Sequence, residues 1–364
     1  MASSRSRLTN VALSVAMAVA LLGGWFACTQ QESEITGPQS DVPAALLGVR
    51  PAALASLIQV QERQTDNLLA LPGVVGTAVG LTADGRPAIK IYTRSARVAG
   101  IPLSLEGAPV VVEQTGDFHT MELRAGRSTA GVAPLSNPTR RFGRPVPTGV
   151  STGNAGECSA GTIAARVKKP NGDVFALSNN HVYGLENSAN IGSNVLQPGR
   201  FDTNCATHAG DVIGTLADFQ PINFSPTANN KIDAAIAATS TANLRNSTPA
   251  DGYGRPFSST MAASVGQDVQ KFGRTTKLTH GEISGVNATV LIGYSSGPAR
   301  FVKQIIVSTS GPFIQPGDSG SLLVTDPGRR PVGLLFAANG PGTFSIANRI
   351  DLVLKNFGVT IDGQ

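Results

Sequence analysis

The chain has 364 residues, of which 15% are charged and 41 are glycines. This length allows roughly two or three domains and a sizeable core. The low charge content is more typical of a β-rich secreted protein than of a helical cytosolic one. The formal net charge of +5 is mild and the chain has no run of lysine or arginine, so nothing indicates a nucleic-acid partner.

Residues 1–28 have the pattern of an export signal. Arg5 and Arg7 form a basic start, and an uncharged, mostly apolar stretch runs from Val11 to Ala27. A membrane anchor is the alternative, but this stretch is at the short limit for a spanning helix, and a polar linker over residues 29–45 follows it. We therefore expect an exported protein that is periplasmic, held at the cell surface or secreted.

Cys28 ends this segment. The residues around it, Trp25-Phe26-Ala27-Cys28, resemble the processing site of bacterial lipoproteins, where the cysteine is acylated after cleavage. Ala27 fits such a site, whereas Trp25 and Phe26 depart from it. Two outcomes stay open: an acylated Cys28 that attaches the protein to a membrane, or a leader that is removed without acylation.

A small α/β domain is predicted over residues 46–125. Pro51 suits the first turn of a helix that extends to Ala70 and carries an apolar face. Three strands are expected after it, at Val74–Leu81, Ala88–Tyr92 and Val110–Val112. The domain is either a pro-segment, acting as an intramolecular inhibitor or chaperone, or an accessory unit that stays attached.

Residues 126–144 predict a linker, because arginine, proline, glycine and serine are frequent there. An activating cut in such a segment would be accessible to proteases. Over residues 145–364, short apolar segments alternate with polar turns, which predicts a barrel or sandwich of β-strands. The expected strands are Ala160–Val167, Val174–Ser178, Val212–Leu216, Ile232–Ala238, Val269–Phe272, Ile283–Leu291, Phe301–Val307, Ser321–Val324 and Val332–Ala337, and a helix is expected at Ile350–Phe357.

The most informative stretch is Gly317-Asp318-Ser319-Gly320-Ser321. Its glycines permit backbone angles and close approaches that other residues do not. The turn can therefore aim the backbone N–H groups of Gly317 and Ser319 at one point beside the Ser319 hydroxyl. A nucleophile next to such an oxyanion hole is what acyl transfer requires. Because a serine in a glycine-rich turn is common, the motif needs a base and an orienting carboxylate elsewhere.

Both groups are present upstream. His181 follows the apolar run Val174–Ser178, and Asp233 is the one carboxylate in the apolar segment Lys231–Ala237. Burying a carboxylate is costly unless it has a partner such as an imidazole N–H. Taken singly, His181 could be a structural residue at a strand end and Asp233 a solvent-facing residue at a strand edge. The order His, Asp, Ser is that of the chymotrypsin-type catalytic triad.

Three segments resemble the signature blocks of trypsin-like serine peptidases, namely Asn180-His181-Val182, Asp233-Ala234-Ala235 and Gly317-Asp318-Ser319-Gly320. Val269–Thr276 is similar to the Gly-x-Thr-Thr segment of the bacterial streptogrisin-like branch. The resemblance covers roughly residues 140–364. It implies a mainly β, chymotrypsin-like fold of two six-stranded barrels with a C-terminal helix. In that fold His181 would be the general base, Asp233 would orient it and Ser319 would be the nucleophile.

The resemblance also implies supporting residues. Asp318 needs a basic partner, which either Lys271 or Arg274 could supply. Phe313 stands in the primary specificity (S1) pocket where members that cut after basic residues carry aspartate, so we expect a preference for an uncharged residue before the cut. The segment Leu335–Gly340 should supply the substrate-binding strand but departs from the usual pattern there.

Cysteine usage fits an exported protein. If Cys28 is acylated or removed, Cys158 and Cys205 can pair with none left over. They flank His181, in a region where trypsin-like enzymes often have a bridge, and two free thiols are the alternative. No group of His, Cys, Asp or Glu has the spacing of a metal site, and the resemblance implies no cofactor.

These patterns predict an exported serine endopeptidase that hydrolyses polypeptides through an acyl-enzyme. Two alternatives use the same residues: a non-catalytic or autoinhibited binding module on the same fold, and an esterase-type acyl hydrolase with the same triad. Resistance of Ser319 to a reactive phosphonate would indicate the first alternative. Activity on small esters without activity on peptides would indicate the second.

Overall fold

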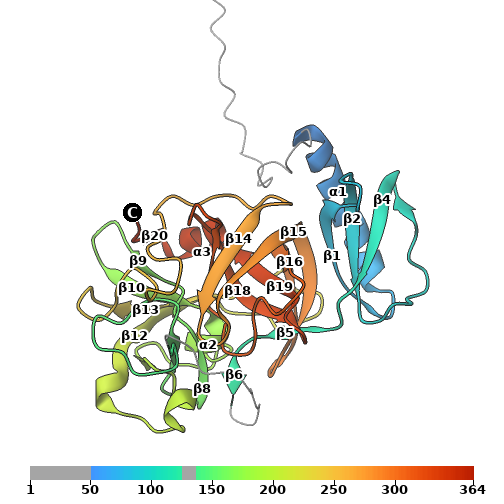
Figure 1. The fold of residues 1–364 in the computed structure, drawn as a ribbon. Helices are drawn as coiled ribbons and strands as arrows, with labels where there is room; N and C mark the ends of the chain where they lie inside the picture. Colours follow the sequence, from blue (N-terminus) through green and yellow to red (C-terminus); the bar gives the residue numbers. More distant parts are fainter. Residues whose placement is uncertain (1–50, 125–136) are drawn as a thin grey trace, which may run out of the picture. The chain divides into compact units, whose positions relative to one another are not determined.

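The computed structural model describes residues 51–124 and 137–364, which are mainly β-strand (Figure 1). The predicted leader, the polar linker and Cys28 lie outside the described residues. Up to residue 124 the elements are α1 (Pro51–Leu69), β1 (Val74–Leu81), β2 (Pro87–Thr93), β3 (Ser104–Leu105), β4 (Ala108–Gln114), β5 (Phe118–Thr120) and β6 (Leu123–Arg124). None of the helices within the described ranges has the length and apolar character needed to cross a bilayer.

The elements after residue 137 form two groups of strands, with a short helix near the middle of the chain and a longer one near its end. In chain order they are β7 (Ser151–Asn154), β8 (Ser159–Thr162), β9 (Ala165–Lys168), β10 (Val174–Ser178), α2 (Asn180–Tyr183), β11 (Asn194–Leu196), the 3-10 turns η1 (Arg200–Thr203) and η2 (Ala209–Asp211), β12 (Val212–Phe219), β13 (Ala235–Thr239), β14 (Asp268–Gly273), β15 (Lys277–Tyr294), β16 (Gly297–Ser308), β17 (Leu322–Thr325), β18 (Pro331–Asn339), β19 (Phe344–Arg349), α3 (Ile350–Phe357) and β20 (Thr360–Ile361).

Helix α1 packs on strands β1 and β2. Its residues Leu54, Leu57 and Leu68 are buried at helical spacing, and they share one apolar cluster with Ile89 and Ile91 of β2. Strand β2 also pairs in parallel with β4. The helix and the three strands expected in this region are therefore present, although β2 and β4 are longer than the sequence pattern indicated.

Strand β1 joins this small sheet to a larger one. It pairs antiparallel with β15, with Gly76 opposite Val290. At the same contact, the buried Asn287 side chain donates a hydrogen bond to the Gln61 side chain at 2.9 Å. Buried polar side chains rarely lack such partners. The sheet of the predicted small α/β domain thus continues, through β1 and β15, into the larger sheet.

The larger sheet contains a closed ring of six strands. Its order is β14-β17-β18-β19-β16-β15, and β15 pairs back with β14. Such closure leaves no free edge, which is the definition of a barrel. A second sheet has the order β20-β9-β10-β13-β12-β11-β7-β8-β6. The predicted mainly β architecture is thus confirmed.

Helix α3 lies against residues of both sheets. Its side chains Val353 and Phe357 share an apolar cluster with Phe175 of β10 and Leu322 of β17. The helix ends at Gly358, whose φ of 62° closes the last turn. The predicted bounds of this C-terminal helix are confirmed.

Among the strands predicted after residue 145, only Val174–Ser178 has the predicted bounds at both ends, and two of the others differ in ways that matter for the site. The one expected over Ala160–Val167 is split into β8 and β9. The one expected over Ile232–Ala238 begins only at Ala235. Before that point the Asp233 N–H donates to the Asn348 side chain at 3.0 Å instead of to a neighbouring strand.

The second half of the predicted linker is attached to the nine-stranded sheet. Over residues 137–144, the Arg141 guanidinium pairs with the buried Asp211, and the Phe142 N–H donates to the Gln197 side chain at 3.1 Å. The residues of this part of the predicted linker thus have partners for backbone and charge at Asp211 of η2 and at Gln197, which follows β11.

Cys158 and Cys205 are joined by a disulfide across 47 residues of sequence, so the predicted pairing is confirmed. The closed loop contains His181. Cross-linking a loop of this length removes conformational entropy from the unfolded chain.

The double variant Cys158→Ser/Cys205→Ser is expected to lower the free energy of unfolding by about 3–4 kcal/mol, the entropy cost of opening such a loop. Urea unfolding followed by circular dichroism measures the loss. Each single serine variant should lose a similar amount, and an unchanged unfolding midpoint would contradict the expectation.

Candidate active site

His181 and Asp233 meet because the strands that carry them pair. Strand β10 leads into α2, which holds His181, and Asp233 lies just before β13. The two strands are antiparallel, with Ser178 opposite Ala235. As a result His181 Nδ1 lies 2.5 Å from Asp233 Oδ2, and the His181 backbone N–H donates to Asp233 Oδ1 at 3.2 Å.

The carboxylate of Asp233 has a third donor that the sequence analysis did not identify. Tyr294, the last residue of β15, donates its hydroxyl to Asp233 Oδ2 at 2.8 Å. Its ring also meets the His181 ring edge-on, with 6.0 Å between the centroids. Asp233 is fully buried, so these donors offset the cost of removing its charge from water. Tyr294 had no recognisable signal, because its role depends on a strand register that the sequence does not show.

The pKa of His181 is raised above its ordinary value. Complete burial acts to lower it, but the negative charge of Asp233 and its hydrogen bond outweigh burial, and the charges of Glu122 and Glu186 add to the rise. An imidazole with a raised pKa is a stronger base. Its Nε2 atom is buried and has no hydrogen-bond partner among the described residues.

Ser319 lies in the loop before β17, where two glycines have positive φ. Gly317 has φ 104° and Gly320 has φ 92°, values that favour glycine. The Ser319 hydroxyl donates to the Phe336 carbonyl at 3.0 Å rather than to His181. The loop reaches the His181 side of the cleft through β8, since a Cβ on Gly161 would touch both Val182 and the Ser319 carbonyl.

The backbone N–H groups of Gly317 and Ser319 point at one atom. Both donate to the carbonyl oxygen of Met121, at 2.6 Å and 3.1 Å. Met121 belongs to the segment between β5 and β6, in the part of the chain that was expected to form a separate small domain. The sequence offered no signal for this contact.

Asp318 is held by donors from the segment before β15 and from its own loop. It accepts hydrogen bonds from the backbone N–H groups of Thr275, Thr276 and Gln315 and from the Thr276 hydroxyl, at 2.7–3.2 Å. The fully buried Lys271 ammonium lies 3.7 Å from it. Burial lowers the pKa of Lys271 to about 8, although the charge of Asp318 acts to raise it.

Arg274, the other candidate partner for Asp318, is engaged elsewhere. Its guanidinium forms an ion pair with Asp202 of η1. The guanidinium carbon also lies over the Phe201 ring, 5.6 Å from the ring centroid. Its backbone N–H donates to the Thr162 hydroxyl, and its side chain passes close to Gly317 without reaching Asp318 as an ion pair. Of the two candidates, Lys271 is the one that forms an ion pair with Asp318, whereas Arg274 pairs with Asp202 of η1.

The segment around Met121 pairs with strands on both sides of the Ser319 loop. Strand β5 is antiparallel to the end of β18, with Thr120 opposite Ala337. Strand β6 is antiparallel to β8, with Leu123 opposite Ala160. His181, Asp233 and Ser319 are all fully buried, which is consistent with a cleft that the chain itself covers.

The predicted S1 residue, Phe313, is fully buried in an apolar cluster that includes Met121, Ile314 and Ala338. Met121 is itself 3% exposed. The Met121 side chain therefore lies among uncharged groups.

A cluster of charged groups follows Met121. Glu122 is buried, and burial raises its pKa to about 7, although His181 and Arg124 act to lower it. Arg124 pairs with Glu122 at 2.8 Å and with Glu186 at 3.0 Å, and it lies 3.4 Å from Glu157. A hollow of about 170 Å³ beside this cluster is lined by His119, Thr120, Glu122, Arg124, Gly293, Tyr294 and Ser295.

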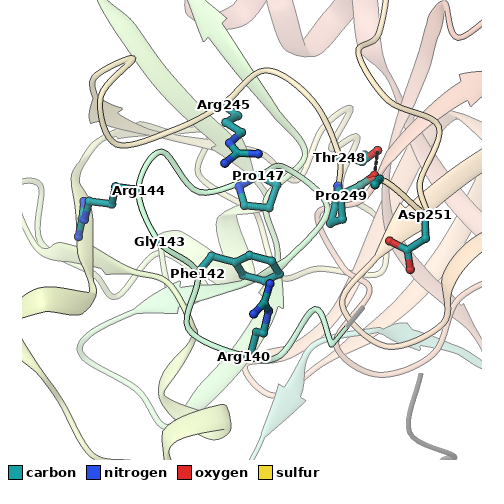
Figure 2. A pocket seen from close by; sticks show the side chains of 10 residues that line it. Arg140, Phe142, Gly143, Arg144, Pro147, Arg245, Thr248, Pro249 and Asp251 are labelled. Carbon is teal, nitrogen blue, oxygen red and sulfur yellow. Dashed lines mark hydrogen bonds between the residues drawn. The ribbon is translucent and has the colours of Figure 1, made fainter. Parts of the chain in front are cut away.

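A wider hollow of about 570 Å³ lies away from these residues (Figure 2). Its lining includes Arg140, whose guanidinium stacks on the Phe142 ring at 4.4 Å, and also Arg144, Arg245 and Asp251. None of the predicted site residues lines it. Within the described ranges, no group of three or more His, Cys, Asp or Glu side chains could hold a metal ion.

Comparison with family models gives no match, and no curated protein sequence matches the chain. Solved structures do match. A glutamic acid specific serine protease is 22% identical, with 59% of this chain and 100% of that chain covered and a TM-score of 0.41. Protease A of Thermobifida fusca is 18% identical, with 60% and 98% covered and a TM-score of 0.43. A chymotrypsin of Cellulomonas bogoriensis is 21% identical, with 60% and 98% covered and a TM-score of 0.41.

These solved structures are chymotrypsin-fold serine proteases of bacteria, and the chain resembles them over about 60% of its length. The N-terminal part of the chain is not covered.

The raised pKa of His181 predicts how a reaction that uses it as a base will depend on pH. The rate of Ser319 acylation by a small ester should fall as the pH drops through a value above the ordinary 6.5, because the protonated imidazole cannot accept a proton. The rate measured between pH 5 and 9 tests this. Asp233→Asn should move the fall to lower pH and reduce the rate by about 10⁴-fold, whereas a flat profile would contradict the role of His181.

Replacing the two basic residues separately tests which one supports the loop. Lys271→Met and Arg274→Met each break a buried ion pair and should each cost about 3–5 kcal/mol of stability, measured by urea unfolding. In a Met121→Asp protein, whose residues 118–124 should no longer cover Ser319, only Lys271→Met should also abolish the reaction of Ser319 with a phosphonate probe, because Asp318 loses its cation. Equal loss of reactivity in both variants would contradict the assignment.

Proposed function

We propose that the protein is an exported serine endopeptidase that hydrolyses peptide bonds through an acyl-enzyme, without a cofactor. The observation that carries the proposal is that the N–H groups of Gly317 and Ser319 both donate to one peptide carbonyl oxygen, that of Met121. Two such donors stabilise the oxyanion that forms when a hydroxyl attacks a carbonyl carbon. The attacking hydroxyl would be that of Ser319.

His181 and Asp233 support the same chemistry. Asp233 accepts from Nδ1, which leaves Nε2 as the atom that can take a proton from Ser319 and later give it to the leaving amine. The Ser319 hydroxyl must first leave the Phe336 carbonyl, a rotation about one side-chain bond. The hydrogen bonds of Asp233 to the His181 and Tyr294 side chains keep the imidazole in one orientation.

Backbone pairing favours a peptide substrate over a small ester. The protein's own residues 118–124 show how an extended chain can bind here. They pair with β18 before the carbonyl that Gly317 and Ser319 bind, and with β8 after it. Recognition on both sides of one peptide bond is what an endopeptidase requires, since it cuts within a chain. An esterase that acts on small molecules has no use for a groove of this kind.

Export is the part of the proposal that rests on sequence and on the disulfide. The basic start and apolar stretch of residues 1–28 are typical of a leader. The bridge between Cys158 and Cys205 suits an oxidising compartment. Attachment to a membrane through an acylated Cys28 remains a prediction.

Reaction with a phosphonate probe, followed by mass spectrometry, tests the nucleophile. Because residues 118–124 cover the site, the full chain is examined beside a Met121→Asp variant, in which a carboxylate cannot be buried in the apolar cluster that holds Met121 without a large cost. We expect the probe on Ser319 in Met121→Asp and hydrolysis of casein by that variant. The added change Ser319→Ala should abolish both, with a loss in kcat on the order of 10⁶.

The exposed Ser310 provides the control, and Ser310→Ala should behave as the parent. A folded Met121→Asp protein, with an unchanged circular dichroism spectrum, that neither binds the probe nor cuts casein would contradict the proposal in favour of a non-catalytic module. Hydrolysis of small esters without any peptide hydrolysis would favour the esterase.

A further inference from the structure

We propose that the protein's first substrate is its own chain, and that Ser319 cuts the bond between Met121 and Glu122. This inference rests on the proposed function and deepens it, because it names a bond and the side chains that select it. Residues 118–124 carry it, since they run through the cleft on both sides of the oxyanion hole.

The residues before the bond lie as a bound substrate must. Strand β5 is antiparallel to β18, so its backbone is extended. The Met121 N–H donates to the Phe336 carbonyl at 3.2 Å, while the Met121 carbonyl accepts from Gly317 and Ser319. The backbone of Met121 is therefore held on both sides of its Cα, with its carbonyl oxygen bound by the N–H group of Ser319 itself. Holding the reacting groups in this way lowers the entropy cost of the reaction.

The residues after the bond are held equally well. Leu123 is fully buried and pairs with Ala160 of β8. Arg124 is anchored by Glu186 and by the Ser295 hydroxyl, which its guanidinium reaches at 2.9 Å. The Met121–Glu122 bond thus lies between two anchored strands, and its carbonyl oxygen is the one that Gly317 and Ser319 bind.

The site is assembled while the bond is intact. Asp318 already has its buried partner Lys271 and its N–H donors from Thr275 and Thr276, so the Ser319 loop does not need a newly formed amino terminus to take its shape. The first cut can therefore be made within one molecule.

The chemical step balances within the chain. The Ser319 oxygen bonds to the Met121 carbonyl carbon, its proton passes to His181 Nε2, and the carbon–nitrogen bond to Glu122 breaks as that nitrogen takes the proton. Water then attacks the ester, gives one proton to His181 and leaves its hydroxyl on the carbonyl carbon. The proton returns to Ser319, which leaves one fragment ending in Met121 and another starting with Glu122.

The full chain tests this directly. Intact mass and amino-terminal sequencing of the wild type should show a fragment that begins with Glu122, at a rate independent of protein concentration. Ser319→Ala should remain intact. Met121→Leu, with a similar apolar side chain, should still be cut, whereas Met121→Asp should lose cutting at this bond by at least about 100-fold, because the S1 pocket offers no partner for a carboxylate.

The outcomes separate the two proposals. A wild type that stays joined between residues 121 and 122, while Met121→Asp binds the probe and cuts casein, would overturn self-cleavage and leave the endopeptidase intact. The same holds if the first cut falls within the predicted linker, 126–144, instead. Absence of probe labelling, casein hydrolysis and self-cleavage together would overturn both.

A separate observation supports a second proposal, that Glu157 and Glu186 form a site for a basic side chain three residues after the cut bond. Glu186 is buried and does not depend on Arg124 for its position. It also accepts from the backbone N–H groups of Ser295 and Ser296, at 3.2 Å and 2.7 Å. Its backbone has φ 54°, between two other non-glycine residues with positive φ, and such strain persists only where surrounding contacts enforce it.

Once Glu122–Arg124 leaves the cleft, these two carboxylates remain as a preformed acceptor. The expected substrate is then a chain with methionine, or another apolar residue of similar size, before the cut and arginine at the third position after it. Arginine suits this acceptor because its planar fork can meet both carboxylates at once.

Two synthetic peptides with the sequence of residues 118–125, one with arginine and one with glutamine at the position of Arg124, test the preference. The Met121→Asp protein should cut the arginine peptide with a kcat/KM at least about tenfold higher, mainly through KM. In the Glu186→Gln background the two peptides should become nearly equal, while the exposed Glu282→Gln should change nothing. Equal rates for the two peptides in the Met121→Asp protein would overturn this second proposal. A preference for the arginine peptide that survives Glu186→Gln would overturn it too.

Discussion

The hydrogen bond between His181 and Asp233 is the interaction on which the rest of the site depends. Both side chains are wholly removed from water, so each would be costly without the other. The pairing of β10 with β13 brings them together, and the Tyr294 hydroxyl completes the coordination of the carboxylate. Because Tyr294 comes from the six-stranded ring, this one carboxylate ties both sheets together at the place where the chemistry is proposed.

Much of the fold and several site positions could be predicted from local patterns. His181, Asp233 and Ser319 lie in short segments whose residue types fit their chemistry, and apolar runs located most strands. What could not be predicted depends on contacts between distant segments. Tyr294 meets Asp233 only because of the register of β15, and Arg274 turns to Asp202 only because η1 lies beside it. Asp233 itself is outside β13, because Asn348 binds its N–H.

The N-terminal part shows more clearly that contacts between distant segments cannot be predicted from local patterns. Its helix and strands were predictable from spacing, yet the sequence indicated a separate small domain. An open strand edge carries no mark of the strand that will pair with it, so the joining of β1 to β15 could not be foreseen. The course of residues 118–124 through the cleft was equally hidden, because backbone hydrogen bonds do not depend on side-chain identity.

The buried pair of Lys271 and Asp318 has a consequence for how such a protein is kept inactive before it meets its substrate. Because the Ser319 loop already has its shape, the site cannot be kept inactive by disorder of that loop. It can be kept inactive only by a segment that occupies it. A tethered segment competes at an effective concentration on the order of millimolar, which an ordinary dilute substrate does not overcome. That advantage belongs to the covalent tether rather than to the contacts, and breaking a single link would turn a permanent occupant into a ligand that dilution removes.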